Sequence, residues 1–303
     1  MGLKRIIGLL GFHFFAERLK NRFMAGETIE EAVARAKLLQ QRGEKSTINI
    51  LGEHAENVAQ ANKFCKQVIA LTLLLAREGM FDVNIAVKPS SIGLDVSYEL
   101  YKRNNYKILS TANYYLPRIS IETDAEEDSY RGQVLETALD YCSCFPNQIV
   151  ACQINRKDAM MEIEMLARAG ISVRLCKGAY PGDITKIADL RRSFLVNAKN
   201  LAHFGMRPFL ATHDLFLIDA MAERFAAHKD KFEFELLMGI EENLSKESHL
   251  QGFTFRRYIP CGPNWKPYGK RRAETIVDIW LRNFLHRAVK GGEKYGPVTI
   301  WQP

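Results

Sequence analysis

The chain has 303 residues, of which 47% are hydrophobic and 25% are charged, which is the composition of a folded globular protein. With 20 glycines and 10 prolines it is neither collagen-like nor of low complexity, and its length suits two average domains or one α/β barrel. A formal net charge of +7 suits nucleic acid, an anionic membrane surface or an anionic ligand, and does not choose among them.

The first 45 residues are predicted to form helices that pack on the rest of the chain. Residues 1–15 are apolar like a signal peptide, but no Ala-x-Ala cleavage site follows, and Glu17, Arg18 and Lys20 continue a helical pattern. A second helix with an alanine-rich middle is predicted over 30–41. No apolar run reaches the roughly 18 residues that a membrane span needs.

From residue 46 onward, short β-type runs alternate with amphipathic stretches. Strands are predicted over 47–52, 83–88, 119–124, 148–154, 171–177, 207–213, 232–238 and 254–260. Helices are predicted over 55–77, 132–142, 157–169, 187–202 and 215–227. This alternation is typical of a (β/α)8 TIM-type barrel, which we predict for residues 46–303. A doubly wound parallel sheet is the alternative, although no Gly-x-Gly-x-x-Gly follows any strand.

The six cysteines lie in apolar or strand-like stretches and are interpreted as reduced thiols in a reducing compartment. Cys142, Cys144 and Cys152 are close in sequence, but no His-x-His or second cysteine pair completes a set of four ligands. We therefore expect no metal site.

Polar or ionisable residues stand at the end of each predicted strand, where such a barrel builds its active site. In chain order they are Glu53, Lys88, Asp124, Gln153, Arg174, Lys177, Thr212, His213, Glu235 and Tyr258. Cationic, anionic and aromatic groups on one rim indicate a small zwitterionic substrate, a polyanionic cofactor, or both.

Several motifs follow one another in a specific order. They read IETDAEED at 121–128, VRLCKGAY at 173–180, ATHD at 211–214, FEFELLMG at 232–239, and YIPCG at 258–262 followed by WKPYGKRR at 265–272. In this order they resemble the flavin-dependent proline dehydrogenases, both the stand-alone enzymes and the first module of the bifunctional proline-catabolic enzyme. With MAGE at 24–27 and LGE at 51–53, the resemblance spans roughly residues 20–285. It implies a distorted (β/α)8 barrel that binds FAD and oxidises L-proline to Δ1-pyrroline-5-carboxylate, with hydride passing to flavin N5.

The resemblance also implies a set of cofactor contacts at the strand ends. These are Asp124, Gln153, Arg174, Lys177, Gly178, Ala179, Thr212 and His213. The cations Arg174 and Lys177 would stabilise an anionic reduced flavin. A histidine such as His213 can instead be a core residue bonded to the backbone. Cys176 stands where the family carries an aliphatic residue, and we expect it to serve packing.

On the substrate side, the resemblance implies an ion pair of Lys88 with Asp124, which together with Tyr258 form the catalytic set. Substrate-binding residues would be Lys88, Tyr180, Leu237, Tyr258, Arg271 and Arg272. The two arginines match a pair that grips the proline carboxylate, a task that suits the planar guanidinium. Glu126 and Glu127 are expected to be the acidic first turn of a helix.

Other functions remain open at this stage. A flavin barrel that oxidises hydroxyproline or a related cyclic amino acid is the nearest alternative, and folate reductases share the architecture but not these motifs. An aldolase would need a Schiff-base lysine within a strand, and a metal hydrolase would need a ligand cluster. A nucleic-acid-binding protein would need a basic stripe interleaved with aromatic residues, which is absent.

The resemblance further implies that electrons pass from FAD to a quinone-type acceptor. We therefore expect a cytoplasmic protein with peripheral contact at the inner face of the cell membrane, through basic surface charge and the apolar residues 298–301. The chain is too short to hold a second dehydrogenase module, so a separate pyrroline-5-carboxylate dehydrogenase is expected to consume the product.

Overall fold

The structure is a computed structural model that describes residue 18 and residues 20–290. Eight parallel strands close a barrel in the order β1 to β8, with β8 paired to β1. The strands are β1 Lys45–Ile50, β2 Val83–Val87, β3 Ile121–Thr123, β4 Gln148–Gln153, β5 Ser172–Cys176, β6 Phe209–Ala211, β7 Glu233–Leu237 and β8 Thr254–Cys261. The predicted (β/α)8 barrel is confirmed, and closure between β8 and β1 excludes the doubly wound sheet.

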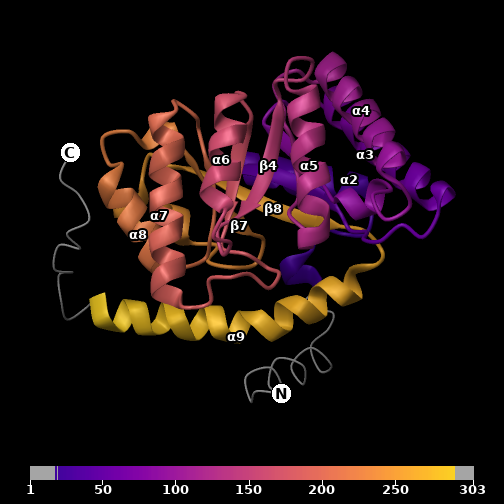
Figure 1. Ribbon diagram of the computed structural model, residues 1–303. Helices are drawn as coiled ribbons and strands as arrows, with labels where there is room; N and C mark the ends of the chain where they lie inside the picture. Colours follow the sequence, from indigo (N-terminus) through magenta and orange to yellow (C-terminus); the bar gives the residue numbers. More distant parts are fainter. Residues whose placement is uncertain (1–17, 19, 291–303) are drawn as a thin grey trace.

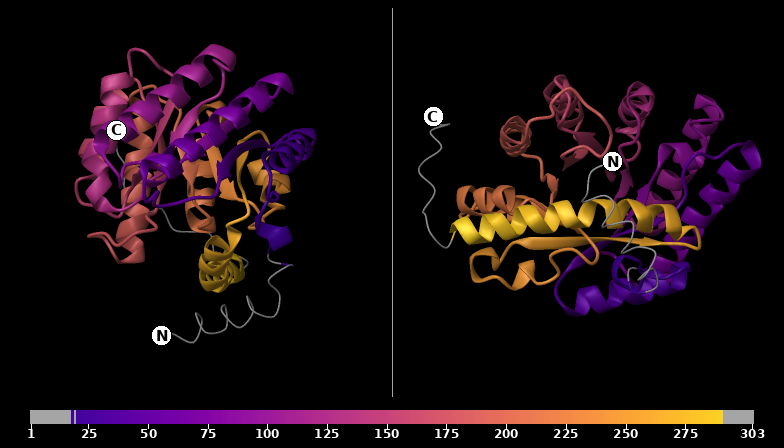
Figure 2. Two further views of the ribbon diagram at one scale, coloured as in Figure 1. Left: turned by 90° about the vertical axis from the view of Figure 1, so that its right-hand side faces the viewer. Right: turned by 90° about the horizontal axis from the view of Figure 1, so that it is seen from below.

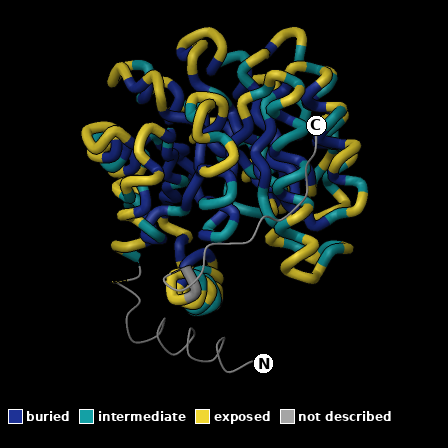
Figure 3. Tube along the Cα trace, turned by 90° about the vertical axis from the view of Figure 1, so that its left-hand side faces the viewer, coloured by how far each residue is buried: buried dark blue, intermediate teal, exposed yellow. Residues whose placement is uncertain are grey.

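Helices surround the strands, as Figures 1 and 2 show. They are α2 Ile29–Gln41, α3 Val58–Arg77, α4 Tyr98–Tyr115, α5 Asp128–Tyr141, α6 Ala159–Arg168, α7 Ile187–His203, α8 Leu215–Arg224 and α9 Trp265–Lys290. The helices α2 to α8 pack apolar residues on the strands in one large core, which includes Leu71, Ile108 and Leu166. Figure 3 shows the buried segments gathered in the interior of the molecule. Among the described residues, no helix has the length and apolar content to cross a membrane.

Polar side chains at the helix starts explain where several helices begin. Thr28 and Glu31 form a reciprocal capping box at the start of α2, and Asn57 and Ser97 accept backbone N–H groups at the starts of α3 and α4. Such caps satisfy amides that have no partner within the helix. The helix α4 has a capped start, but the sequence patterns did not predict it.

The described N-terminal part of the chain contains the helix α2 next to the start of the barrel. The helix α2 packs on β1 and β8, and β1 begins at Lys45, beside the predicted boundary between residues 45 and 46. The division of the chain at that boundary stays a prediction, because residues 1–17 and 291–303 lie outside the described residues.

The interior of the barrel is ionic as well as apolar. Glu122 of β3 accepts hydrogen bonds from Thr47 of β1 at 2.9 Å and from Arg174 of β5 at 3.0 Å. Since these strands are not neighbours, the contacts pass through the inside of the barrel. Nearer the other end, Arg256 of β8 binds Glu233 of β7 at 2.8 Å. Buried charges of this kind are tolerated because each meets an opposite charge.

The helix α9 runs along one end of the barrel (Figure 1) and contacts α8. Its first turns pack Trp265 and Tyr268 against Phe23, Met24 and Leu51. Near its other end, buried Asn283 donates hydrogen bonds to the His213 carbonyl at 3.0 Å and to the Glu241 carboxylate at 2.8 Å. The helix is therefore fastened at two places and spans the strand ends between them.

Candidate active site

One large cavity of about 820 Å³ opens at the carboxyl ends of the strands. Side chains from the ends of all eight strands and from α9 line it. Every residue predicted for the site is among them: Lys88, Asp124, Gln153, Arg174, Lys177, Gly178, Ala179, Tyr180, Thr212, His213, Leu237, Tyr258, Arg271 and Arg272. The structure therefore brings the predicted residues together, while their individual roles stay predictions.

Arg174 stands at the centre of the cavity floor. Its guanidinium donates to Glu122 at 3.0 Å and to Asp124, and it lies 5.3 Å from the centre of the Tyr258 ring. Tyr258 in turn donates its hydroxyl hydrogen bond to Asp124 at 2.6 Å. Burial opposes ionisation of Asp124, but the charges of Arg174 and Lys88 outweigh it and lower the pKa of this carboxyl. Asp124 is thus a charged anchor that fixes both the arginine and the phenol.

Glu235 is the second notable carboxyl of the floor. Its Oε2 lies 3.7 Å from Arg174 Nε, and neither of its oxygens has a hydrogen-bond partner among the described residues. Burial, and then the charge of Glu122, raise the pKa of Glu235 to about 8. At neutral pH this carboxyl holds a proton, since three carboxyls face one guanidinium there.

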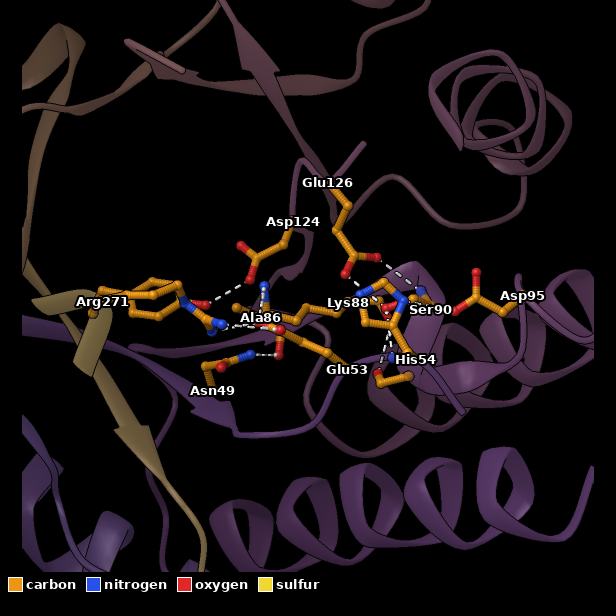
Figure 4. A network of polar contacts seen from close by, with 12 residues as sticks. Asn49, Glu53, His54, Ala86, Lys88, Ser90, Asp95, Asp124, Glu126 and Arg271 are labelled. Carbon is orange, nitrogen blue, oxygen red and sulfur yellow. Dashed lines mark hydrogen bonds and ion pairs between the residues drawn. The ribbon is translucent and has the colours of Figure 1, made fainter. Parts of the chain in front are cut away.

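Lys88 and Arg271 meet at Glu53 on the rim of the cavity (Figure 4). Glu53 Oε1 lies 3.3 Å from Lys88 Nζ and 2.7 Å from Arg271 Nη2. Among the described residues, the direct ion pair of Lys88 is with Glu53, and Asp124, its predicted partner, acts on it as a nearby charge. Burial favours the neutral amine, but the charges of Asp124, Glu126 and Glu53 raise the pKa of Lys88. The ammonium is charged and faces the cavity.

Arg272 differs from its neighbour in what it contacts. Its guanidinium carbon lies 5.3 Å from the centre of the Tyr268 ring. Its buried Nε has no hydrogen-bond partner among the described residues. Arg272 therefore keeps a buried donor available at the cavity wall.

Another ionic group lies in the segments that follow β5 and β6. Lys177 Nζ lies 2.7 Å from Asp214 Oδ2, and Arg191 holds the same carboxylate through two hydrogen bonds of 2.8 and 2.9 Å. Burial lowers the pKa of Lys177 although Asp214 opposes this effect. The sequence analysis quoted Asp214 within a motif but gave it no role. Its partners come from β5 and α7, so only the folded structure could identify them.

The backbone turn after β5 depends on two glycines. Gly178 has a φ of +112°, and a Cβ there would stand 2.4 Å from the Asn155 side chain. Asn155 donates to the Tyr180 carbonyl at 2.8 Å, and a Cβ on Gly182 would also meet it, at 2.5 Å. Close approach to Asn155 thus requires glycine at both positions and sets where Tyr180 lies.

His213 and Cys176 are both partly buried at the cavity wall. The His213 Nε2 accepts the Leu237 N–H at 2.9 Å, and burial together with nearby cations lowers its pKa to about 3. The imidazole is therefore neutral and bonded to the backbone, which was the alternative interpretation. Burial raises the pKa of the Cys176 thiol to about 11, so it is a protonated packing residue, as expected.

The position of Glu126 differs from the predicted one. It was expected in the acidic first turn of a helix, but α5 begins at Asp128 and Glu126 is buried before it. Its carboxylate accepts the Ser90 N–H at 2.8 Å and the Ser90 hydroxyl at 2.7 Å. Nothing in the local sequence signals this, because the partner lies 36 residues earlier.

Gln153 also has an unexpected set of partners. Its amide nitrogen donates to the Glu126 carbonyl at 3.2 Å, and its Oε1 accepts the N–H groups of Ala179 and Tyr180 at 2.9 and 3.1 Å. The predicted cofactor contact would have to share these atoms. Among the described residues, no cluster of histidine, cysteine and carboxylate side chains could hold a metal ion.

Comparisons with known proteins place this site in context. No family model matches the chain. Proline dehydrogenase 1 of Bacillus subtilis (strain 168) is 31% identical over 83% of the chain and 84% of that protein. Proline dehydrogenase of Deinococcus radiodurans is 27% identical over 85% of the chain and 86% of that protein.

The likeness extends to solved structures. The crystal structure of proline utilization A (PutA) from Bdellovibrio bacteriovorus, inactivated by N-propargylglycine, superposes with a TM-score of 0.81 at 20% identity. The match covers 97% of the chain and 37% of the PutA chain. At that identity the superposition supports the barrel fold.

Proposed function

Because the chain belongs to the proline dehydrogenase family, we propose that its cavity binds FAD beside L-proline and oxidises proline to Δ1-pyrroline-5-carboxylate. The enzyme is an oxidoreductase that acts on proline in proline catabolism. The observation that carries the finer proposal is the convergence of all the predicted cofactor and substrate residues on one cavity of about 820 Å³. Cavities of this size, largely apolar with a few convergent polar groups, are typical of cofactor and substrate sites.

The cavity suits FAD in its chemistry. Arg174 Nε and the Glu235 carboxyl are buried without a hydrogen-bond partner among the described residues, which is costly unless a polar ligand or water meets them. Lys177 and Arg282 supply positive charge at the cavity wall for a diphosphate. The residues that would hold FAD are Asp124, Gln153, Arg174, Lys177, Gly178, Ala179, Thr212 and His213. When bound, FAD would supply the two-electron acceptor that takes a hydride at N5 from the proline ring.

The chain's own residues bind and orient the substrate. Lys88, Arg271 and Arg272 present positive donors to the proline carboxylate, and each charge-assisted hydrogen bond contributes about 1.5–3 kcal/mol. Tyr180, Leu237 and Tyr258 form the walls around the ring. Asp124 fixes the Tyr258 phenol at 2.6 Å, so the wall is rigid on that side. Lys88, Asp124 and Tyr258 are the residues that we assign to catalysis.

The primary test is an absorption spectrum and a proline oxidation assay with an artificial electron acceptor. We expect flavin bands in the purified protein and proline-dependent reduction of the acceptor. A folded protein that neither contains nor takes up FAD, or that leaves proline unchanged, would refute the proposal. Faster turnover of hydroxyproline than of proline would favour the alternative substrate, with replacement of Tyr258 by serine as the variant that shifts the preference.

The arginine pair permits a sharper test. Replacing Arg271 or Arg272 by methionine should weaken proline binding about ten- to a hundredfold, because about 1.4 kcal/mol corresponds to a factor of ten. FAD content should stay at the parental level. Lysine at either position should restore little, since a point charge cannot reproduce the planar fork. Lys270→Met is the matched control, because Lys270 is an exposed neighbour on the same helix.

We further propose that electrons pass to a quinone-type acceptor and that the cytoplasmic protein contacts the inner face of the membrane peripherally. The net charge of +7 and the exposed Trp280, Phe284 and Leu285 of α9 support this contact. Residues 298–301, the other predicted contact, lie outside the described residues. Binding to anionic liposomes, measured with and without residues 294–303, separates the contribution of the C-terminal residues from that of the rest of the protein. A separate pyrroline-5-carboxylate dehydrogenase would take up the product.

A further inference from the structure

Buried and part-buried hydrogen bonds join the loops that follow β1, β2, β3 and β5 with Gln153, the last residue of β4. Ser90, in the turn after β2, is fully buried and is the first junction. Its hydroxyl oxygen accepts the His54 N–H at 3.1 Å, and its carbonyl accepts the Ala55 N–H at 3.1 Å. The loop after β1 is thus fastened to the turn after β2.

Glu126 is the second junction, and it links in two directions. Its carboxylate accepts both the N–H and the hydroxyl hydrogen of Ser90, as Figure 4 shows beside His54 and Lys88. Its own carbonyl accepts the Gln153 amide at 3.2 Å, and Gln153 holds the N–H groups of Ala179 and Tyr180. We call this set, His54, Ala55, Ser90, Glu126, Gln153, Ala179 and Tyr180, the loop belt.

The loop belt runs close beside the substrate side of the site. Glu53 precedes His54, Lys88 stands two residues before Ser90, Asp124 stands two residues before Glu126, and Tyr180 is itself a member. At its three side-chain junctions the belt is shielded from water, since Ser90, Glu126 and Gln153 are 0%, 5% and 9% exposed. Water therefore cannot readily replace a lost bond there.

We propose that Glu126 is a positioning residue for proline oxidation. Through the loop belt it fixes the positions of Lys88, Glu53 and Tyr180 relative to one another around the substrate. It touches neither substrate nor cofactor in this assignment. Its side chain receives Ser90 from one side while its backbone carbonyl receives Gln153 from the other. The assignment rests on the proposed function for its effect on proline, but the bonds themselves can be tested without substrate.

The test compares Glu126→Ala, Glu126→Gln and Ser90→Ala in the FAD-loaded enzyme. Glu126→Ala should raise the KM for proline about tenfold or more while kcat changes much less, because misplaced charges weaken binding first. Glu126→Gln should recover most of this loss, since its carbonyl oxygen can still accept the Ser90 N–H. The double variant Glu126→Ala with Ser90→Ala should lose less than the sum of the two single losses, because both substitutions remove the bond from the Ser90 hydroxyl to Glu126.

Glu162→Gln is the matched control. Glu162 is also a buried carboxyl, at 9% exposed, and lines a small cavity together with Glu126, but it lies on α6 and has no bond to the loop belt. Its replacement should leave the KM for proline at the parental value. An equal rise in the control would show that loss of any buried carboxyl suffices and would overturn the assignment.

Hydrogen–deuterium exchange of the enzyme without proline gives a readout that does not depend on the proposed function. In Glu126→Ala the amides of His54, Ala55 and Ser90, and also of Ala179 and Tyr180, should exchange at least about tenfold faster together. Unchanged exchange at both 54–55 and 179–180, or unchanged KM, would overturn the proposal. If Glu126→Ala fails to fold, Ser90→Ala, which removes the bond from the Ser90 hydroxyl to Glu126, gives the same two readouts. If the parent does not oxidise proline, the proposed function fails. The exchange result still tests whether Glu126 holds the loops together through the loop belt.

Discussion

Replacing Glu235 by glutamine is expected to stabilise the protein near neutral pH. The side chain is 3% exposed, its nearest cation is Arg174 at 3.7 Å, and Glu122 and Asp124 bind that same guanidinium. In the unfolded chain such a carboxyl ionises near its ordinary pKa of 4.5, whereas in the folded protein its pKa is about 8. The folded state therefore holds a proton that the unfolded chain releases.

The sign of the effect follows from that difference. Stability contributed by this group is fully present below pH 4.5 and is lost as the pH rises to about 8. The loss amounts to about 1.4 kcal/mol for each pH unit, so between about pH 5 and pH 7.5 it is on the order of 3 kcal/mol. Glutamine does not ionise, so the variant does not lose this stability. Its free energy of unfolding should therefore rise relative to that of the parent over this pH range.

Urea denaturation at several pH values measures the difference in the free energy of unfolding between Glu235→Gln and the parent. A gap that does not change with pH, or a parent that is the more stable protein at about pH 7.5, would refute the reasoning. Glu233→Gln is the control with the opposite sign. Glu233 lies on the same strand and is 2% exposed, but the charges of Arg256, Lys45 and Arg207 overcome burial and lower its pKa. Its replacement should destabilise the protein by about 3–5 kcal/mol at neutral pH.

Three further outcomes are expected. Asp124→Asn should lower the free energy of unfolding at neutral pH by about 1.5–3 kcal/mol. Because the folded state lowers the pKa of Asp124, this difference between variant and parent should vanish as the pH falls below the ordinary pKa of 3.8, which denaturation along a pH series checks. Gly178→Ala should reduce FAD retention about tenfold or more, because the added Cβ would stand 2.4 Å from the Asn155 side chain. Equal FAD retention by variant and parent after dialysis would contradict this prediction. The ring nitrogens of His213 should show no titration by NMR from about pH 5 to pH 8, because its pKa is about 3.

The sequence predicted the barrel because its buried strands read as compact apolar runs separated by amphipathic helices. β4, Gln148–Gln153, ends one residue before the predicted end. The strands β2, β3 and β5 end earlier than predicted because the polar residue that closes each run, Lys88, Asp124 or Lys177, belongs to the loop, whereas β8 ends one residue later than predicted, at Cys261. Lys88 precedes a 3-10 turn, and Asp124 follows β3, Ile121–Thr123.

The residues of the site were predicted from motifs, but their partners were not. Which carboxylate binds Lys88, or which serine binds Glu126, depends on loops that the barrel brings together from 35 and 36 residues away. Local sequence cannot distinguish the buried Glu126 from the adjacent exposed Glu127, because both stand in one acidic run. The same holds for Asp214, whose partners Lys177 and Arg191 lie on other elements.

The ionic seam between the first and last strands has a consequence for how the chain folds. Arg256 binds the Ser46 carbonyl at 2.7 Å across 210 residues, and Arg257 binds Glu44 at 2.9 Å across 213 residues. Neither bond can form before β8 has paired with β1, so a partly assembled barrel leaves Glu44 without its partner Arg257. Buried unpaired charges are strongly unfavourable, and contacts so distant in sequence form late. Partial assemblies should therefore be poorly populated at equilibrium, and a chain cut before β8 should fail to form a stable barrel.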